Sequence, residues 1–312
     1  MIKTTIGVDI SKDVFDAHRL PDGAQRQFAN DKTGWRAFIK WLDGSSVERI
    51  VFEATGAYHR AFEQAIDKAG LPLCKVNPRL ARRFGEALGK LAKTDRMDAA
   101  MLARFGTALQ PPVRPAPTRL QCDLKELLVA RMALVKDRTA AKNRQKNLSC
   151  ALLKRHAEQR LKKIERQIDE VETAIRDLIE ANPDLARRFR ILTSIPGIAE
   201  RAAFALIIDM PELGSLDARA AAGLSGTAPM TRKSGKKTGK AFVQGGRPNV
   251  RAALYMPALV AARFNPDLKA KYNQLLAAGK PAKVALTAVM RKLVILANAL
   301  IRDDRSWSPG NP

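Results

Sequence analysis

Cysteine, histidine and aromatic residues are scarce in this sequence, and each shortage excludes a class of protein. The three cysteines, Cys74, Cys122 and Cys150, have no C-x-x-C spacing, so we expect neither a zinc site nor a disulfide scaffold. The three histidines are too isolated from one another to form a His-rich metal site. Aromatic residues number 11 Phe, 3 Trp and 3 Tyr, which is too few for a series of base-stacking platforms.

Long apolar segments are also absent. No apolar run reaches 18 residues, the length of a membrane-spanning helix; the nearest run, 254–262, is bounded by Arg251 and Arg263. The first residues, MIKTTIG, lack the apolar stretch of a secretory signal. We therefore expect a soluble, cytoplasmic protein that has no membrane partner.

Positive charge is what the sequence has in excess. It contains 55 Lys and Arg against 31 Asp and Glu, a net charge of +24, while 46% of its 312 residues are apolar, enough for a packed core. Solubility does not require so large an excess, so the composition indicates a polyanionic partner; a basic protein from a basic proteome is the alternative. The length suggests two domains of about 150 residues each.

Strand and helix patterns alternate over residues 1–117. Strands are expected at 2–10, 14–19 and 25–28, and helices then alternate with two further strands. This order predicts a mixed α/β domain in which helices cover a sheet. The domain ends in a linker, because the four prolines in residues 110–117 cannot continue a helix.

A helical region follows over residues 118–182, with no glycine or proline between 119 and 181. Apolar residues in its second half recur at spacings of 3, 4, 3, 4 and 3, which is the pattern of a coiled coil. We expect a coiled-coil dimerisation region that forms a homodimer or a dimer of dimers; the alternative is a long amphipathic helix packed on its own domain. Residues 183–312 predict a helical third domain. The apolar seam consists of Leu161, Ile164, Ile168, Val171, Ile175 and Leu178.

Four acids stand at the ends of predicted elements. Asp9 ends the first strand and Glu53 ends the fourth, so adjacent parallel strands would present both at one sheet edge. Asp95 and Asp98 lie three residues apart where a loop enters a helix, which puts them on one face. Four carboxylates converge only around cations, and hard oxygen ligands select Mg²⁺ or Mn²⁺, the ions of phosphodiester transfer. Asp16, on the second strand, is expected to alternate away from this edge or to face solvent.

The stretch from Thr231 to Arg251 is basic and rich in glycine, and it contains no acid. It predicts a mobile loop whose cations neutralise phosphates. Ser234 lies within it, and neighbouring cations or a metal ion could activate its hydroxyl as a nucleophile; a solvated loop serine is the alternative. The cations of this stretch are Arg232, Lys233, Lys236, Lys237, Lys240, Arg247 and Arg251.

A second basic stretch lies in the helical region. Residues 138–163 contain nine Lys or Arg and a single acid, Glu158. This ratio favours a polyanion such as RNA lying along the helix, and a solvated helix surface is the alternative. The candidates for nucleic-acid binding in this stretch are Arg144, Lys146, Lys154 and Arg155.

Several short motifs resemble those of a known family. Residues 7–13 (GVDISKD), 52–58 (FEATGAY) and 93–99 (KTDRMDA) are similar to the three acidic motifs of the DEDD transposases. These enzymes belong to the bacterial insertion-sequence family often called "one-ten", which also includes the Piv pilin-gene invertase. Further motifs follow in the order of the family; they are residues 194–198 (SIPGI), 226–229 (GTAP), 233–236 (KSGK) and 251–257 (RAALYMP).

The resemblance implies an organisation and a chemistry. It implies a RuvC-like RNase H fold for a nuclease domain at 1–117, a coiled-coil dimerisation region at 118–182 and a C-terminal transposase domain at 183–312. It also implies a structured bridge RNA that guides the enzyme to double-stranded DNA, whose strands are cleaved and rejoined. The residues carried over from the motifs are Asp9, Glu53, Asp95 and Asp98 as Mg²⁺ ligands and Ser234 as the nucleophile that becomes linked to DNA.

Two other functions fit part of the pattern. A RuvC-like Holliday-junction resolvase would hydrolyse DNA with the four acids and would not need Ser234. A non-enzymatic nucleic-acid-binding protein would explain the charge and the helical seam, but not the acids. Ser225 is a rival nucleophile, although the preceding Gly223 and Leu224 indicate a helix end.

Overall fold

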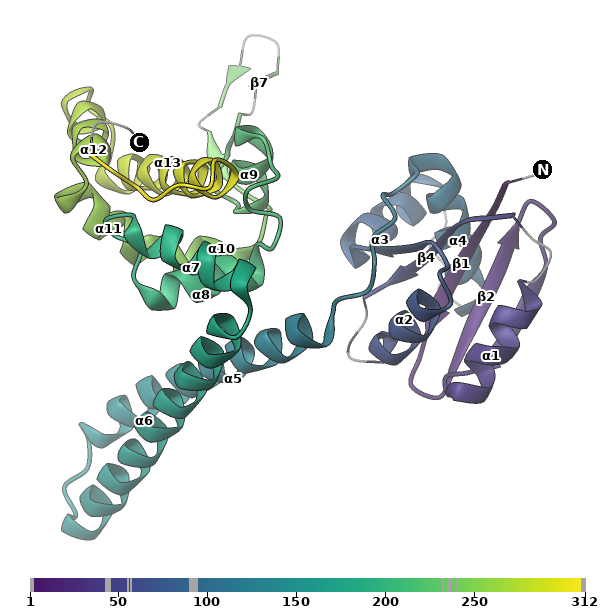
Figure 1. Ribbon diagram of the computed structural model, residues 1–312, viewed down its shortest axis with the longest axis horizontal. Helices are drawn as coiled ribbons and strands as arrows, with labels where there is room; N and C mark the ends of the chain where they lie inside the picture. The colour runs from purple at the N-terminus through teal and green to yellow at the C-terminus, as the bar shows by residue number, and fades with distance from the viewer. Residues whose placement is uncertain are drawn as a thin grey trace. The chain divides into compact units, whose positions relative to one another are not determined.

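The computed structural model divides into two compact units, Met1–Thr118 and Arg119–Pro312 (Figure 1). The division lies directly after the proline-rich segment 110–117, and each unit has its own apolar core. Only the backbone is described for residues 95–97, 233–234 and 237–238. The structure describes residues 3–42, 46–54, 56, 58–89, 95–231, 233–234, 237–239 and 241–309.

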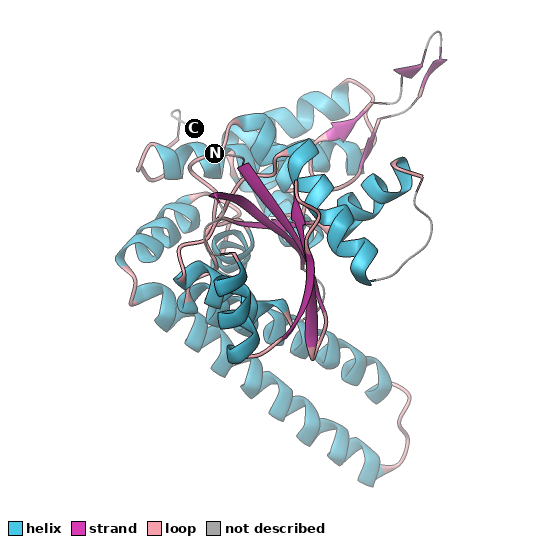
Figure 2. Ribbon diagram, turned by 90° about the vertical axis from the view of Figure 1, so that its right-hand side faces the viewer, coloured by secondary structure: helices cyan, strands magenta, loops and turns pink. Residues whose placement is uncertain are grey.

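The N-terminal unit is built on a mixed sheet, drawn in magenta in Figure 2. Its strands are β1 (Lys3–Ile10), β2 (Val14–Leu20), β3 (Gln25–Ala29), β4 (Ser46–Glu53) and β5 (Leu73–Val76). Their order across the sheet is β3-β2-β1-β4-β5. The pairs β1–β2 and β2–β3 are antiparallel, whereas β1–β4 and β4–β5 are parallel. The prediction of a mixed α/β fold for this part of the chain is confirmed.

Helices cover both faces of this sheet; they are α1 (Lys32–Trp41), α2 (His59–Lys68), α3 (Pro78–Ala87) and α4 (Asp95–Leu109). Phe38 of α1 and Phe62 of α2 pack on one face, in the same apolar cluster as Phe52 of β4. Phe105 of α4 packs on the other face, in a cluster with Val51. Because successive strand residues point to opposite faces, β4 is apolar on both sides at its centre.

A close backbone contact joins α4 to β1 at Gly7. A Cβ atom on Gly7 would lie 2.0 Å from the carbonyl oxygen of Ala99 and 2.3 Å from the amide nitrogen of Ala103, so only glycine allows this approach. Gly106 fits against the sheet in the same manner, because its Cβ would lie 2.6 Å from the side chain of Val51. One glycine on the strand and one on the helix therefore set the height of α4 above the sheet.

The helical region predicted at 118–182 is a hairpin rather than one long helix. Its arms are α5 (Arg119–Gln145) and α6 (Ala151–Glu180), which lie antiparallel to each other in both ribbon views. The break at 146–150 contains asparagine and serine, whose side chains compete with the helix for backbone hydrogen bonds. The hairpin therefore brings the apolar face of α6 onto α5 of the same chain.

The seam residues of α6 are buried or half-buried inside this hairpin and its unit. Ile164 and Ile168 pack in one cluster with Leu134 and Ala141 of α5. Ile175 is fully buried in the main core of the unit. The seam is thus covered within one chain, as in the alternative of an amphipathic helix packed on its own domain. Association of two chains stays a prediction.

The described remainder of the C-terminal unit is mostly helical and packs against α13. The helices are α7 (Pro183–Ser194), α8 (Glu200–Asp209), α9 (Ala218–Leu224), α10 (Pro248–Ala253), α11 (Tyr255–Phe264), α12 (Pro266–Ala277) and α13 (Ala282–Arg302). α13 is the one described helix that is long and apolar enough to cross a membrane, and 56% of its most apolar window is buried inside the unit. Val289, Leu293 and Leu300 are fully buried core residues of α13, so its apolar character is explained by packing.

Replacement of Gly7 by alanine should destabilise the N-terminal unit by about 1–3 kcal/mol, because the added methyl group pushes α4 away from β1. Chemical denaturation followed by tryptophan fluorescence measures this effect, since Trp35 and Trp41 both belong to α1. Gly85→Ala in α3 is the matched control, because its Cβ would meet nothing nearer than Met101 at 3.8 Å. The control should keep or slightly raise the unfolding midpoint, and equal midpoints for the two variants would contradict the role of Gly7.

Candidate active site

Asp9 and Glu53 lie next to each other at one edge of the sheet. β1 and β4 are parallel and pair Val8 with Phe52, so the next pair in this register is Asp9 and Glu53. Neighbouring strands are about 4.8 Å apart. Val8 and Phe52 point into the core on the side of α1 and α2, and strand alternation therefore turns both acids to the side of α4. The register brings the two acids together, as the sequence predicts.

The first turn of α4 lies over the same edge. α4 runs antiparallel to β1, because Gly106 packs on Thr5 whereas Ala103 packs on Gly7. Two strand residues and four to five helix residues each advance about 7 Å. Gly7 lies under Ala99 and Ala103, and Asp9 is two strand residues farther along β1. The helix residues above Asp9 are therefore four to five residues earlier in α4, at 95–98.

Asp98 belongs to this first turn and is half-buried. The backbone of Asp95 begins α4, so the two acids that the sequence assigns to a loop entrance both stand on the helix itself. The side chain of Asp95 lies outside the described residues. Three of the four predicted acids, Asp9, Glu53 and Asp98, are therefore assigned to this edge from the described residues, and Asp95 is assigned by its backbone alone.

Asp16 also lies on this face, and the expectation that it points away is wrong. β1 and β2 pair with Asp9 opposite Asp16, and directly opposed residues share a face. Asp16 is 7% exposed and accepts hydrogen bonds from Gln27 Nε2 at 3.1 and 3.3 Å. It lines a cavity of about 150 Å³ with residues of β3 and α4. The β1–β2 hairpin pairs Ile10 with Phe15, and this register places Asp16 opposite Asp9. The length of the turn between the two strands is therefore the sequence signal that could have located Asp16.

Asn30 braces the two segments that follow the acidic strands. Its side-chain Nδ2 donates to the carbonyl oxygen of Ser11 at 2.9 Å and to that of Tyr58 at 3.2 Å. Its Oδ1 accepts from the indole N–H of Trp35 at 3.0 Å. Ser11 follows β1 and Tyr58 precedes α2, so one amide links both sides of the acidic edge to α1.

The acids fit a divalent cation in the chemistry of their side chains. Carboxylate oxygens are the ligands that Mg²⁺ prefers, and Asp9, Glu53 and Asp98 come from three elements that meet at one edge. Among the described side chains, no group of three His, Cys, Asp or Glu is close enough to enclose one ion. Asp95, the fourth member of the predicted set, is not among those side chains.

Ser234 lies in the C-terminal unit, in a segment with two short strand pairs. β6 (Pro229–Met230) pairs with β9 (Phe242–Val243), and β7 (Lys233–Ser234) pairs with β8 (Lys237–Thr238). Figure 1 draws β7 apart from the helices of its unit. Strand pairs thus replace part of the expected mobile loop. The side chains of Lys233, Ser234 and Lys237, and all of Arg232, Lys236 and Lys240, lie outside the described residues.

Two of the cations expected to neutralise phosphates have partners within the protein. Arg247 donates two hydrogen bonds of 2.7 Å to the Glu212 carboxylate, and this interaction raises the pKa of Arg247 above its ordinary value. Arg251 Nη1 donates to the carbonyl oxygens of Gly226 and Gly245. Both arginines therefore have a role within the fold that the sequence did not predict, and phosphate contact by either stays a prediction.

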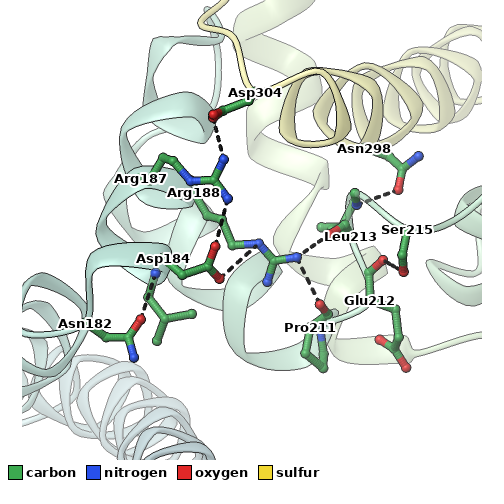
Figure 3. Close-up of polar contacts among 12 residues, drawn as sticks. Asn182, Asp184, Arg187, Arg188, Pro211, Glu212, Leu213, Ser215, Asn298 and Asp304 are labelled. Carbon is green, nitrogen blue, oxygen red and sulfur yellow. Dashed lines mark hydrogen bonds and ion pairs between the residues drawn. The ribbon is translucent and has the colours of Figure 1, made fainter.

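The loop that carries Glu212 is itself held from two sides (Figure 3). Arg188 of α7 donates to the carbonyl oxygens of the two residues that flank Glu212. Asn298 of α13 accepts from the amide of Gly214 at 2.8 Å. The partner of Arg247 therefore stands on a fixed loop.

Ser225 is fully buried, which excludes it as a nucleophile in this structure. Its Oγ lies 2.9 Å from Thr227 Oγ1 and donates to the carbonyl oxygen of Ala222. α9 ends at Leu224, with Ser225 as its C-terminal cap. The interpretation of this segment as a helix end is confirmed.

The four cations singled out in the helical region gather at the turn of the hairpin. Arg144 lies in the last turn of α5, Lys146 lies directly after that helix, and Lys154 and Arg155 lie at the start of α6. All four residues are exposed. A concentration of like charges at one end of a helix pair suits a polyanionic partner.

Comparisons with known proteins identify the family of the chain. Residues 6–155 match a family of DEDD transposases, described as "Transposase", and residues 189–273 match the "Transposase IS116/IS110/IS902 family". The pilin gene-inverting protein of Moraxella lacunata is 30% identical over 98% of both chains, and that of Moraxella bovis is 29% identical over the same shares. A Streptomyces coelicolor protein described as an insertion element IS110 uncharacterized protein is 28% identical over 46% of this chain and 35% of its own length.

The matches identify a DNA transposase or recombinase, an enzyme class that moves or inverts DNA segments. The chain belongs to the IS116/IS110/IS902 family of transposases.

Substitution of Asp9 by asparagine should abolish DNA strand cleavage and leave nucleic-acid affinity near that of the wild type. If Asp9 holds a metal ion, its replacement removes several kcal/mol of transition-state stabilisation, so the cleavage rate should fall by about 100-fold or more. Affinity depends mainly on phosphate neutralisation by basic surfaces, which this change leaves intact. Gel-based cleavage and equilibrium binding assays measure the two quantities. Asp13→Asn, at an exposed acid, is the control, and an Asp9→Asn protein that cleaves in Mg²⁺ would refute the assignment.

Proposed function

We propose that this transposase cleaves and rejoins double-stranded DNA with an acidic set on a RuvC-like RNase H fold and with a serine nucleophile. The acidic set consists of Asp9, Glu53, Asp95 and Asp98, and the nucleophile is Ser234. The observation that carries the proposal is the register of β1 and β4, which brings Asp9 beside Glu53 under the first turn of α4. Unrelated acids have no reason to meet at one sheet edge, where their charges repel each other.

The acidic set would hold Mg²⁺ or Mn²⁺. Membership of a DEDD family suggests dependence on a divalent metal, and the carboxylates present are the donors that such ions select. When bound, the ions would lower the charge on the scissile phosphate and on the oxygens that attack and leave. The Asn30 brace supports this assignment, because it joins Ser11, which follows β1, to Tyr58 on the segment after β4.

Ser234 would perform the covalent step. Its Oγ attacks the phosphorus of a DNA phosphodiester, so that an Oγ–P bond forms while a P–O bond to deoxyribose breaks. The serine proton passes to water, and the leaving oxygen takes up a proton. A second strand hydroxyl then attacks the phosphoserine and releases Ser234, which conserves the energy of the phosphodiester during strand exchange.

A structured guide RNA would bind the hairpin of α5 and α6, and two or four chains would assemble on the DNA. The exposed cations at the hairpin turn support the first part. The serine segment adds basic residues from its own strand pairs, which suit the DNA backbone. Arg232, Lys233, Lys236, Lys237 and Lys240 are the residues proposed for this contact.

Substitution of Ser234 by alanine should abolish the protein–DNA adduct that survives denaturation, because no other hydroxyl would occupy its position. The adduct is measured by denaturing electrophoresis of the protein after incubation with end-labelled DNA. Ser225→Ala is the control; it should keep the adduct while losing about 1 kcal/mol of stability through its hydrogen bond to Thr227. A wild-type enzyme that cleaves without any adduct would favour a hydrolytic junction resolvase, and a protein that binds without cleaving would be a non-enzymatic nucleic-acid-binding protein.

Replacement of the four cations at the hairpin turn by glutamine should lower RNA affinity and flatten its salt dependence. Each lost phosphate contact reduces the slope of log K against log salt by about 0.7–0.9. Filter binding at several salt concentrations gives this slope. Lys136 and Arg166, which are exposed on the same two helices farther from the turn, provide a control double substitution. Equal slopes for both variants would mean that RNA binds elsewhere.

A further inference from the structure

The segment 227–244, which contains Ser234, leaves the helical body of its unit and returns to it at one place. Gly226 precedes this segment and Gly245 follows it. A Cβ on Gly226 would lie 2.6 Å from the carbonyl oxygen of Gly245, and one on Gly246 would lie 2.4 Å from the Cα of Gly226. The two ends of the serine segment therefore meet in direct backbone contact.

One side chain binds both of these ends. Arg251 stands on α10, and its Nη1 donates to the carbonyl oxygen of Gly245 at 2.8 Å and to that of Gly226 at 3.2 Å. A guanidinium nitrogen carries two hydrogens in a fixed plane, so a single group can hold two acceptors in a defined geometry. A lysine ammonium keeps the charge but lies on a flexible stem and is more strongly hydrated.

The helix that carries Arg251, α10, is also held in place. The amide of Arg247, immediately before α10, donates to the carbonyl oxygen of Leu224 at 2.7 Å. The side chain of the same arginine forms its two hydrogen bonds to Glu212. α10 is thus anchored at its N-terminal end, and Arg251 extends from this anchored helix to the ends of the serine segment.

We propose that Arg251 is a positioning residue for Ser234. By holding Gly226 and Gly245 together, it fixes the base from which the strand pairs β6–β9 and β7–β8 extend, and so it restricts the directions from which the serine hydroxyl approaches a phosphodiester. Such restriction matters because a displacement of about 1 Å reduces a reaction rate by about 100-fold. The proposal rests on the proposed function of Ser234.

The first test separates the rate of the covalent step from DNA affinity. Arg251→Lys keeps the charge and should reduce the rate of adduct formation at saturating DNA by about 10- to 100-fold, with less than a twofold change in DNA affinity. Arg263→Lys, at an exposed position at the end of α11, is the matched control and should leave both quantities unchanged. If the role of Arg251 were purely structural, Arg251→Lys would alter the unfolding midpoint without separating the rate of adduct formation from DNA affinity. Equal adduct rates for Arg251→Lys and Arg263→Lys would overturn the proposal.

The second test distinguishes positioning from phosphate contact. Arg251→Met removes the charge, so a phosphate contact at this position predicts a loss of about 0.7–0.9 in the salt slope of DNA binding. Positioning predicts an unchanged slope together with faster hydrogen–deuterium exchange in peptides covering residues 227–246. A reduced slope, or unchanged exchange in both Arg251 variants, would overturn the proposal.

The two proposals fail in different ways. If Ser234→Ala still forms the adduct, Ser234 is not the nucleophile and the proposed function is wrong. If Ser234→Ala abolishes the adduct while Arg251→Lys forms it at the wild-type rate, the nucleophile stands and only the positioning role is wrong.

Discussion

The acidic edge depends on a contact in which the backbone of α4 rests directly on the backbone of β1. Gly7 permits it on the strand, and Gly106 permits a similar approach from the helix. Protein interiors are close-packed, so any side chain inserted here would lift the helix and carry Asp98 away from Asp9. Gly7 therefore governs the geometry of the acidic edge because it has no side chain, which allows the two backbones to make contact.

The C-terminal unit holds its candidate nucleophile by the opposite means. Its serine segment stands on a polar frame that links the loop around Glu212 to Arg247 and then to α10. Bidentate arginine–carboxylate hydrogen bonds have strict directional requirements, so they fix the geometry of this frame as well as stabilising it. Backbone proximity of Gly226 and Gly246 completes it. One unit thus positions its candidate catalytic residues by close backbone contact at glycines, and the other does so by charged side chains.

Patterns within single elements were predictable from the sequence, and relations between distant elements were less so. The ends of β1 and β4 were readable from hydrophobic runs that stop at Asp9 and Glu53, and parallel pairing then followed from the order of elements. The side of the sheet that Asp16 faces depends on hairpin register, which strand alternation alone does not give. A heptad seam specifies an apolar partner but not whether that partner belongs to another chain or, as α5 does here, to the same one. Charge alone did not distinguish Arg247, whose partner lies 35 residues away, from a cation exposed to phosphate.

The contact between the ends of the serine segment has an evolutionary consequence. Gly226 and Gly246 are in contact, and Arg251 binds the carbonyl oxygens of Gly226 and Gly245, so these contacts at the two ends offset the entropic cost of closing the segment. The entropic cost of loop closure grows only slowly with loop length, by about 0.6 kcal/mol for each doubling. Insertions, deletions and wholesale replacement beyond the base therefore leave the helical core almost undisturbed. A transposase built in this way can exchange this segment as a cassette while its fold stays the same.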